Sequence, residues 1–337
     1  MPLLKLDAGE ARDRLENKHA FWWKPGIDVE NRRGRFAVQR RNHEVFVPSL
    51  SGDWTKTLEV SRVDPVFAVG SCFARGIEVA LRSRDFQVLS YAAEFDDFEL
   101  ASPNVTGRGF TNKYSSFSIE NELTWALDAE AQFPVESLVE VAEDTVVDPH
   151  VNPTLKWLDL ASTIARRNII SEVYGRAAQA PLIVITLGLV ETWTDLQERV
   201  RLNMAPTSEM VSLNPGRYQF EVTGFAENRD ALDRISRLLN EHGHPDTQIV
   251  VTVSPVPLRA TFSGRDVVAA NAYSKSVLRA AAEEWCFDEP NVHYFPSYEI
   301  VTNSASDNAW KADGRHVQHQ AFSRIMSLFT KTFVTDP

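Results

Sequence analysis

From Asp64 onward, short apolar runs alternate with longer stretches of helical periodicity, and this alternation constrains the fold more than any other feature. The apolar runs occupy residues 65–69, 86–91, 181–187, 248–253 and 292–295. Helical patterns occupy residues 73–83, 119–131, 155–178, 228–241, 266–285 and 316–333. Strand-length runs joined by helical stretches are typical of βαβ units. The sequence therefore predicts an α/β fold of three layers, α/β/α, whose mainly parallel sheet of about five strands is doubly wound in the flavodoxin-like manner.

The chain is expected to divide into an N-terminal extension, residues 1–60, and one large domain, residues 61–337. The extension is rich in aromatic and basic residues: His19, Phe21, Trp22, Trp23, Lys24, Arg32, Arg33, Arg35, Arg40 and Arg41. This mixture indicates either a surface for sugars or anions, or a segment packed on the domain with solvated arginines. Within the domain, residues 191–224 combine turn residues with alternating aromatic residues, which predicts an inserted loop and β-hairpin.

Composition excludes several classes of function. The 337 residues, 43% of them hydrophobic, can bury one large core, and the net charge of −11 disfavours nucleic acid as a partner. The two cysteines, Cys72 and Cys286, fit neither a disulfide framework nor a metal motif. Without a secretory signal or a bilayer-length apolar stretch, the expectation is a cytoplasmic protein with no integral membrane segment. No cofactor is predicted, and a homo-oligomer stays an open alternative.

The strongest local signal is the run PVFAV followed by Gly70, Ser71 and a helical pattern. This order places Ser71 at the carboxyl end of a strand and at a helix N-terminus, where ligands bind in open α/β sheets and developing negative charge is stabilised. The serine can alternatively serve only as the helix N-cap. The neighbouring Cys72 is a second candidate nucleophile, since a helix N-terminus lowers a thiol pKa.

A second signal lies just before the last helical pattern, where Asp313 and His316 share one tight turn. This spacing lets the carboxylate hold one imidazole nitrogen while the other takes a proton from a serine. The alternatives are a capping Asp313 with a surface His316, or a metal pair of His316 and His319. The metal alternative lacks further ligands of suitable spacing, so no metal site is predicted.

Together these motifs resemble the GSCFA family, which is similar to the SGNH/GDSL hydrolases. The resemblance starts at Gly70-Ser71-Cys72-Phe73-Ala74, ends at Asp313-x-x-His316, and includes Asn112-Lys113-Tyr114, residues 186–193, residues 254–258 and residues 294–299. It implies an SGNH-hydrolase fold with Ser71 as nucleophile, His316 as base and Asp313 as the carboxylate that orients it. It also implies a bacterial carbohydrate context, and hence an acylated sugar or polysaccharide as substrate.

The sequence departs from the SGNH pattern at the third block, where an asparagine of the oxyanion hole normally follows the glycine by two residues. Here Gly188 is followed by Leu189, Val190 and Glu191, and an ionised carboxylate cannot donate a hydrogen bond. Glu191 is more readily interpreted as an ion-pair or helix-capping acceptor. The expected substitute donors are the Ser71 backbone N–H, the N–H of Gly107 or Gly109, and above all the side-chain amide of Asn112.

The resulting hypothesis is a serine esterase or O-acyltransferase that forms an acyl-enzyme on Ser71. Arg75 and Arg259 are candidates for holding an anionic substrate group, and His150 and Trp193 for lining the cleft, although surface or packing roles are the simpler interpretation. The rival hypothesis is a non-catalytic carbohydrate-binding protein that retains the fold. A third is hydrolysis of lipids or small esters.

Overall fold

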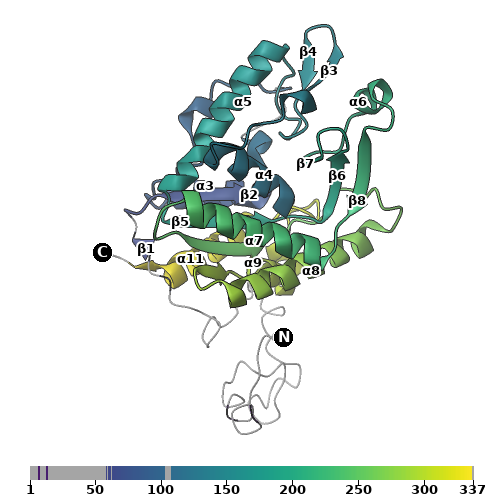
Figure 1. Cartoon of the computed structure of the whole chain (residues 1–337). Helices are drawn as coiled ribbons and strands as arrows, with labels where there is room; N and C mark the ends of the chain where they lie inside the picture. The colour runs from purple at the N-terminus through teal and green to yellow at the C-terminus, as the bar shows by residue number, and fades with distance from the viewer. Residues whose placement is uncertain are drawn as a thin grey trace.

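The computed structural model describes Asp7, Asp13, Leu58 and residues 60–61, 63–102 and 108–335. Its centre is a sheet of four parallel strands in the order β10-β9-β5-β2. Figure 1 labels two of them, β2 and β5. These strands are β2 (Val66–Gly70), β5 (Leu182–Leu187), β9 (Gln248–Val253) and β10 (Val292–Tyr294). Almost every residue in them is buried, which explains why each reads as a continuous apolar run.

The predicted fifth strand, residues 86–91, forms only a single bridge between Val88 and Val66. The reason is local, because the Ser90 hydroxyl accepts the backbone N–H of Ala68 at 3.1 Å. A longer ladder would need that N–H for a backbone hydrogen bond, and here a side chain already occupies it. With this bridge counted as the edge, the strand order in chain numbering is 2-1-3-4-5, as in flavodoxin-like doubly wound sheets.

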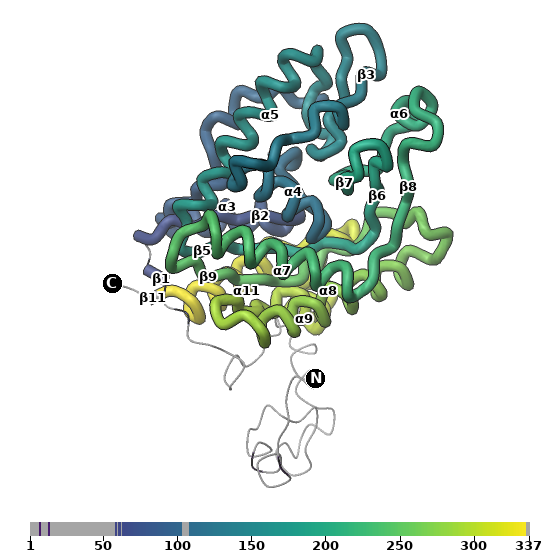
Figure 2. The backbone as a smooth tube through the Cα atoms, viewed as in Figure 1, coloured from purple at the N-terminus to yellow at the C-terminus, as the bar shows by residue number. Residues whose placement is uncertain are grey.

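Helices cover both faces of the sheet, which gives three layers. One face packs on α4 (Ser116–Leu127), α5 (Leu160–Gly175), α7 (Phe225–His242) and α8 (Val267–Asp288). The other packs on α3 (Cys72–Arg82), α9 (Ser297–Asn303) and α11 (His319–Phe333). Figure 2 shows α7 and α8 running side by side. Along β2, Phe67 and Val69 face the first group and Val66 and Ala68 the second, as the alternation of a strand requires.

All six predicted helices are present with shifted ends, and several of the shifts follow capping chemistry. The helix α4 starts at Ser116 because Ser115 and Ser118 form a capping box. The helix α5 starts at Leu160, five residues later than predicted, because Asp159 accepts the N–H of Ser162 at 2.9 Å. The helix α11 starts at His319, because residues 310–317 form a turn closed by a bridge between Trp310 and Val317.

The insertion predicted at residues 191–224 is a three-stranded antiparallel sheet with the order β7-β6-β8. Its strands are β6 (Glu191–Asp195), β7 (Val200–Leu202) and β8 (Tyr218–Val222), with the short helix α6 (Ser208–Leu213) between the last two. A further hairpin that the sequence did not suggest, β3 (Val139–Ala142) with β4 (Thr145–Val147), lies near α5 at the top of Figure 1.

The first and last strands of the described residues, β1 (Val60–Ser61) and β11 (Val334–Thr335), form a two-stranded parallel ladder. The remaining elements are α10 (Ser306–Ala309) and short 3-10 turns at Ala93–Phe95, Gly109–Thr111, Val135–Ser137 and Arg176–Gln179. The predicted extension, with its aromatic and basic residues from His19 to Arg41, lies outside the described residues apart from Asp7, Asp13, Leu58 and Val60.

Candidate active site

Ser71 stands on a sharp turn between β2 and α3, and Gly70 makes that turn feasible. Gly70 has φ +133°, and a Cβ there would lie 2.2 Å from the carbonyl oxygen of Thr186 on β5. The backbone N–H of Ser71 donates to that same oxygen at 3.1 Å. The turn is therefore fastened to the neighbouring strand, and the Ser71 N–H, one of the expected oxyanion donors, is already engaged.

Ser71 is 3% exposed, and its hydroxyl caps α3. Its Oγ accepts the N–H of Phe73 at 3.3 Å and lies 3.1 Å from Oγ1 of Thr186. The capping role is thus realised in the structure. The same residue also lines a cavity, so capping and contact with a ligand coexist.

Asp313 and His316 are joined as their spacing predicts. Nδ1 of His316 and Oδ2 of Asp313 lie 2.6 Å apart, and Oδ1 of Asp313 accepts the backbone N–H groups of Arg315 and His316, both at 2.9 Å. These hydrogen bonds, the side-chain bond to His316 first, hold the pKa of Asp313 below its usual range. The two side chains are about half exposed, 46% for His316 and 47% for Asp313.

Ser71 and His316 are not hydrogen-bonded to each other. The Nε2 atom of His316 instead lies 3.4 Å from Nη1 of Arg315, at the limit of a hydrogen bond. Arg315 itself reaches the cavity that Ser71 lines, and its Nε donates to the carbonyl oxygen of Pro257 at 3.2 Å. The turn that carries the imidazole therefore borders the cavity, while the imidazole does not line it.

The cavity beside Ser71 has a volume of about 600 Å³ and lies at the carboxyl edge of the parallel sheet. Ser71, Gly188 and Ser254 follow β2, β5 and β9 in turn, and all three line it. Carboxyl edges of parallel strands are where ligands bind in open α/β folds. The position of the cavity thus agrees with that general rule.

The cavity wall combines an aromatic surface with unpartnered polar atoms. Trp193, Phe220 and Phe262 pack on one another with ring centroids 5.3–5.8 Å apart. Three buried polar atoms of lining residues have no hydrogen-bond partner: Oγ1 of Thr192, Nε1 of Trp193 and Oγ of Ser254. Buried polar atoms normally have partners, so these three mark where a ligand would find donors and acceptors.

Gly188 is the point where three chain segments meet. Its N–H and that of Leu189 donate to the carbonyl oxygen of Tyr114 at 3.1 and 2.9 Å, and a Cβ on Gly188 would lie 2.6 Å from that oxygen. The carbonyl oxygen of Gly188 accepts a hydrogen bond from Nζ of Lys275 at 2.6 Å. Lys275 is 1% exposed, and burial lowers its pKa from 10.5 to about 7. The sequence analysis did not single out this lysine.

The predicted oxyanion donors are not gathered around Ser71. Nδ2 of Asn112 donates to the Tyr114 hydroxyl at 3.3 Å, and Asn112 lines a neighbouring cavity together with Gly109. Gly107 lies outside the described residues. Glu191 lines the cavity of Ser71. Its carboxylate accepts hydrogen bonds from the Thr261 hydroxyl and the N–H of Phe262, so it secures the loop that contains these two residues.

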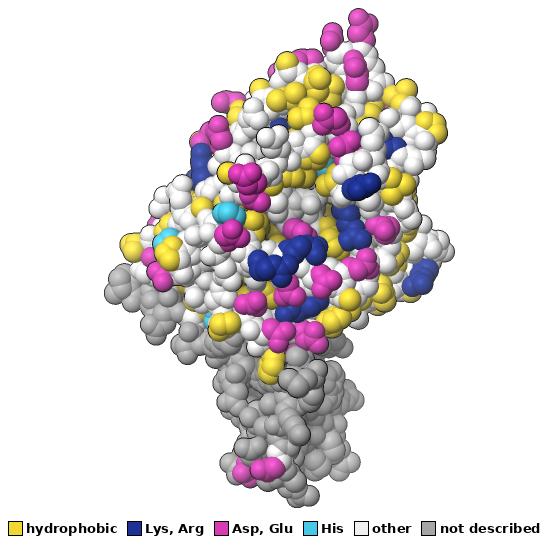
Figure 3. Space-filling model, in the orientation of Figure 1, with side chains coloured by type: hydrophobic (Ala, Val, Ile, Leu, Met, Phe, Trp, Pro, Cys, Tyr) yellow, Lys and Arg dark blue, Asp and Glu magenta, His cyan; other side chains and the backbone are white. Residues whose placement is uncertain are grey.

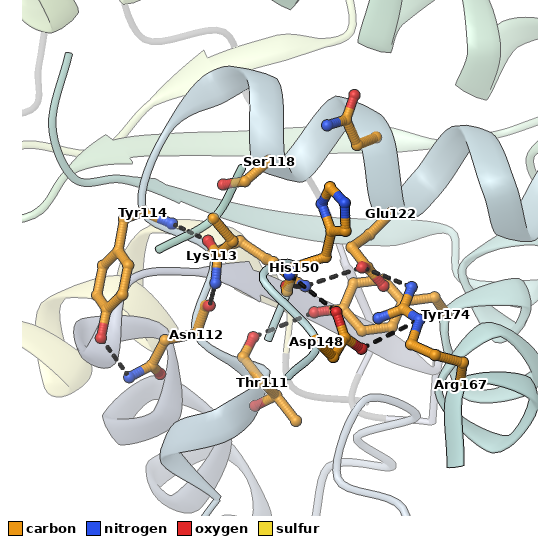
Figure 4. Close-up of polar contacts among 12 residues, drawn as sticks. Thr111, Asn112, Lys113, Tyr114, Ser118, Glu122, Asp148, His150, Arg167 and Tyr174 are labelled. Carbon is orange, nitrogen blue, oxygen red and sulfur yellow. Dashed lines mark hydrogen bonds and ion pairs between the residues drawn. The ribbon is translucent and has the colours of Figure 1, made fainter. Parts of the chain in front are cut away.

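A fully buried charge network anchors the segment that carries Asn112 and Tyr114 (Figure 4). Nζ of Lys113, the residue between them, lies 2.9 Å from Oε1 of Glu122, which also accepts from Arg167 at 2.8 Å. Burial alone would raise the pKa of Glu122, but the cations of Arg167 and Lys113 lower it overall. The N–H of Lys113 donates to the carbonyl oxygen of Gly70 at 2.8 Å, which links the network to the turn of Ser71.

The four subsidiary candidates have different positions. Trp193 and Arg259 line the cavity of Ser71. Arg75 lines the neighbouring cavity. His150 is 2% exposed within the network, where burial, Arg167 and Lys113 lower its pKa well below 6.5. Of the two expected to line the cleft, Trp193 does so and His150 does not.

Charge distribution, metal-ligand groups and helix length can be described for the residues that the structure covers. On the face drawn in Figure 3, Lys and Arg side chains are interspersed with Asp and Glu. Within the described ranges, no group of three or more His, Cys, Asp or Glu side chains has an arrangement that could hold a metal ion. No helix among them is both long enough and apolar enough to cross a membrane.

The fold and the site define an α/β protein with a serine turn at the carboxyl edge of a parallel sheet. Comparison with known families agrees with the motifs, because the model of the GSCFA family matches residues 65–329. The chain therefore belongs to the GSCFA family. A comparison with curated proteins found no match.

Proposed function

We propose that this chain is an SGNH-type serine esterase or O-acyltransferase that acts on acylated carbohydrate through an acyl-enzyme on Ser71. The observation that carries the proposal is the placement of Ser71, which stands on a turn that requires Gly70 and borders a cavity of about 600 Å³. Arg315 lines the same cavity and lies next to His316, which is already bonded to Asp313. A serine, a base and an orienting carboxylate are the parts that acyl transfer needs.

In the proposed reaction, His316 takes the proton from Ser71 while Oγ attacks the ester carbonyl. The leaving alcohol receives that proton, and water or a sugar hydroxyl then accepts the acyl group. The imidazole has to turn toward the cavity first, and its 46% exposure leaves room for that rotation. Asp313 keeps hold of Nδ1 during the turn, so that Nε2 is the nitrogen that accepts the proton.

The unpartnered groups of the cavity wall are the proposed contacts for substrate. The hydroxyls of Thr192 and Ser254 and the indole N–H of Trp193 are available to donate to a carbonyl oxygen or a sugar hydroxyl. The packed rings of Trp193, Phe220 and Phe262 offer a surface on which a sugar ring or an acyl chain can lie.

Ser71 is a better candidate nucleophile than Cys72. Burial raises the pKa of the Cys72 thiol, although Arg315 and Lys275 oppose the effect, so the thiol stays protonated at neutral pH. The rival function is carbohydrate binding without turnover. It is favoured by one observation: the Ser71 hydroxyl pairs with Thr186 and Phe73, not with an imidazole.

A fluorophosphonate probe separates the two functions. We expect covalent labelling of the wild-type protein at Ser71, none of Ser71→Ala, and near-normal labelling of the matched control Cys72→Ala. His316→Ala should label at least a hundredfold more slowly, since a positioned base contributes about that much. Peptide mass mapping locates the adduct.

Three outcomes would contradict the proposal or part of it. Folded wild-type protein that stays unlabelled from pH 6 to 9 favours the binding function, and labelling at Cys72 moves the nucleophile. Unimpaired labelling of His316→Ala removes the proposed base.

A second experiment tests the substrate class by comparing acetate release from acetylated sugars with acid release from short acyl esters. Turnover of the esters alone would indicate hydrolysis of small esters.

A further inference from the structure

A second cavity, of about 480 Å³, lies beside the start of α3 next to the cavity of Ser71. It is formed by α3, residues 91–100 and the turn at residues 108–112. Cys72 lines both cavities. In addition, Asn112 on the wall of the second cavity donates to the hydroxyl of Tyr114, whose residue lines the first. The two cavities are therefore immediate neighbours.

Two arginines in the wall of the second cavity have unused hydrogen-bond donors. The Arg75 guanidinium bonds to Glu78 at 2.6 Å and to the carbonyl oxygen of Ala68 at 3.1 Å, but its Nε has no partner. The Arg108 guanidinium bonds to Asp96 at 2.6 Å, and its Nη1 has no partner. Both nitrogens are buried, and leaving a buried charged donor unpaired is costly.

The surroundings of Arg108 hold its guanidinium in place. The group lies 3.8 Å from the centroid of the Tyr91 ring, and the Arg108 side chain is 9% exposed. Arg82 lies 3.8 Å from the centroid of the same ring. A planar guanidinium fixed in this way is preorganised to bind an anionic oxygen.

Each arginine in the wall is paired with one carboxylate, Arg108 with Asp96 and Arg75 with Glu78. Asp96 is 70% exposed, so water screens its charge. Burial raises the pKa of Glu78, and this carboxyl also accepts from the Ser90 hydroxyl. Its negative charge is therefore more easily neutralised by a proton than that of a solvated glutamate.

The remaining unpartnered atom in this wall is an acceptor. Oδ1 of Asn112, which is 4% exposed, has no hydrogen-bond partner. The second cavity thus offers two cationic donors and one acceptor. This combination suits a ligand with an anionic oxygen group and a neighbouring hydroxyl.

We propose that the second cavity is a subsite for a negatively charged sugar unit, bound through its carboxylate, phosphate or sulfate by Arg75 and Arg108 and through a hydroxyl by Asn112. The subsite deepens the proposed function, because it makes the acylated substrate of Ser71 an acidic glycan with its charge beside the reacting ester. Anion binding itself requires no turnover, so it can be measured separately.

The test is isothermal titration at low salt with glucuronate, glucose 6-phosphate, glucose 6-sulfate and uncharged glucose. We expect at least one anionic sugar to bind and glucose not to bind. Arg108→Gln should weaken that binding at least tenfold. Arg108→Lys keeps the charge but loses the planar guanidinium with its paired N–H donors, so it should weaken binding by a smaller factor. Ser71→Ala should bind as the wild type does, which separates this proposal from the catalytic one.

Arg82→Gln is the matched control, because Arg82 stacks on the same ring but does not line the cavity. It should leave binding within twofold. Equal losses in Arg82→Gln and Arg108→Gln would reduce the effect to general surface charge and overturn the subsite. Failure of all three anionic sugars to bind folded wild-type protein would do the same. If Arg108→Gln does not fold, Asn112→Ala replaces it, with a weaker loss expected.

Discussion

Lys275 is a lysine placed where an apolar residue would be expected. It lies on the buried stripe of α8 with Ser274, Leu278, Ala282 and Trp285, and its amine bonds to a single carbonyl, that of Gly188. Through this bond Lys275 holds the turn that follows β5. Ser274 supports the same turn by accepting the N–H of Val190 at 2.9 Å.

The burial of Lys275 makes stability depend on pH. Its pKa is about 7 in the folded chain against 10.5 when solvated, so between these values the unfolded chain binds more protons. Stability contributed by this group therefore rises with pH through that window, by at most about 1.4 kcal/mol per unit. Below pH 7 the cost of burying the charge is present in full.

We predict that the free energy of unfolding of the wild type, minus that of Lys275→Met, rises from pH 7 to pH 9. Urea unfolding at several pH values measures it. Lys331→Met, which changes an exposed lysine, is the control and should give a flat difference. A flat difference for Lys275→Met as well would mean that its amine keeps its proton in the folded protein.

The candidate site was predictable from sequence where its residues are neighbours in the chain. Ser71 with its turn, and Asp313 with His316, needed only local spacing. The contacts of Asn112 and the unpartnered atoms of Thr192 and Ser254 depend on which segments the fold brings together, and no spacing indicates that. Lys275 did leave a signal, since it lies three and seven residues before Leu278 and Ala282 on one helical stripe.

At the scale of elements, α4 and α5 are joined by the network of Lys113, Glu122 and Arg167. All three side chains are at most 3% exposed, and Glu122 is the carboxylate that bonds to both cations. Neutralising it removes the carboxylate that both cations share and leaves Asp148, 3.6 Å from Nε of Arg167, as the buried counter-charge of the network. Losing the shared carboxylate in this buried network is far more costly than losing a solvated ion pair.

Glu122→Gln should therefore destabilise the protein by about 3–5 kcal/mol. Glu99→Gln is the matched control, because its pair with Lys156 has the same chemistry but both side chains are more than half exposed. The control should cost less than about 1 kcal/mol. Chemical denaturation measures both, and similar losses in the two variants would show that burial of the network contributes nothing.

The elements that the sequence predicted well are those with a continuous apolar run or a clear helical repeat of apolar residues. Strands β2, β5 and β9 lie within one residue of their predicted bounds because they are buried on both faces. The run at 86–91 is less apolar, since it contains Gln87 and Ser90, and the Ser90 hydroxyl ends its pairing. The hairpin β3–β4 was missed because its strands are short and partly exposed, so their sequence lacks a clear apolar alternation.

For the whole molecule, the described core belongs to residues from Leu58 onward. Both large apolar clusters on the two faces of the sheet are assembled from Leu58 to Phe333. We therefore predict that a chain beginning at Leu58 unfolds cooperatively, with a midpoint within about 5 °C of the full chain. Calorimetry of the two chains measures this. A much lower midpoint, or loss of cooperativity, would show that the extension completes the domain's core.

The ladder of β1 and β11 brings Val60 beside Val334, so the domain enters and leaves at one place on its surface. A folded unit whose two ends meet can be carried inside a loop of another protein without stretching its host, and its own ends can be joined and reopened elsewhere. The exposed turn between β6 and β7, where Leu196 is 47% exposed, is a suitable place for new ends. We therefore expect the folded unit between Val60 and Val334 to tolerate insertion into another protein as well as fusion at one end.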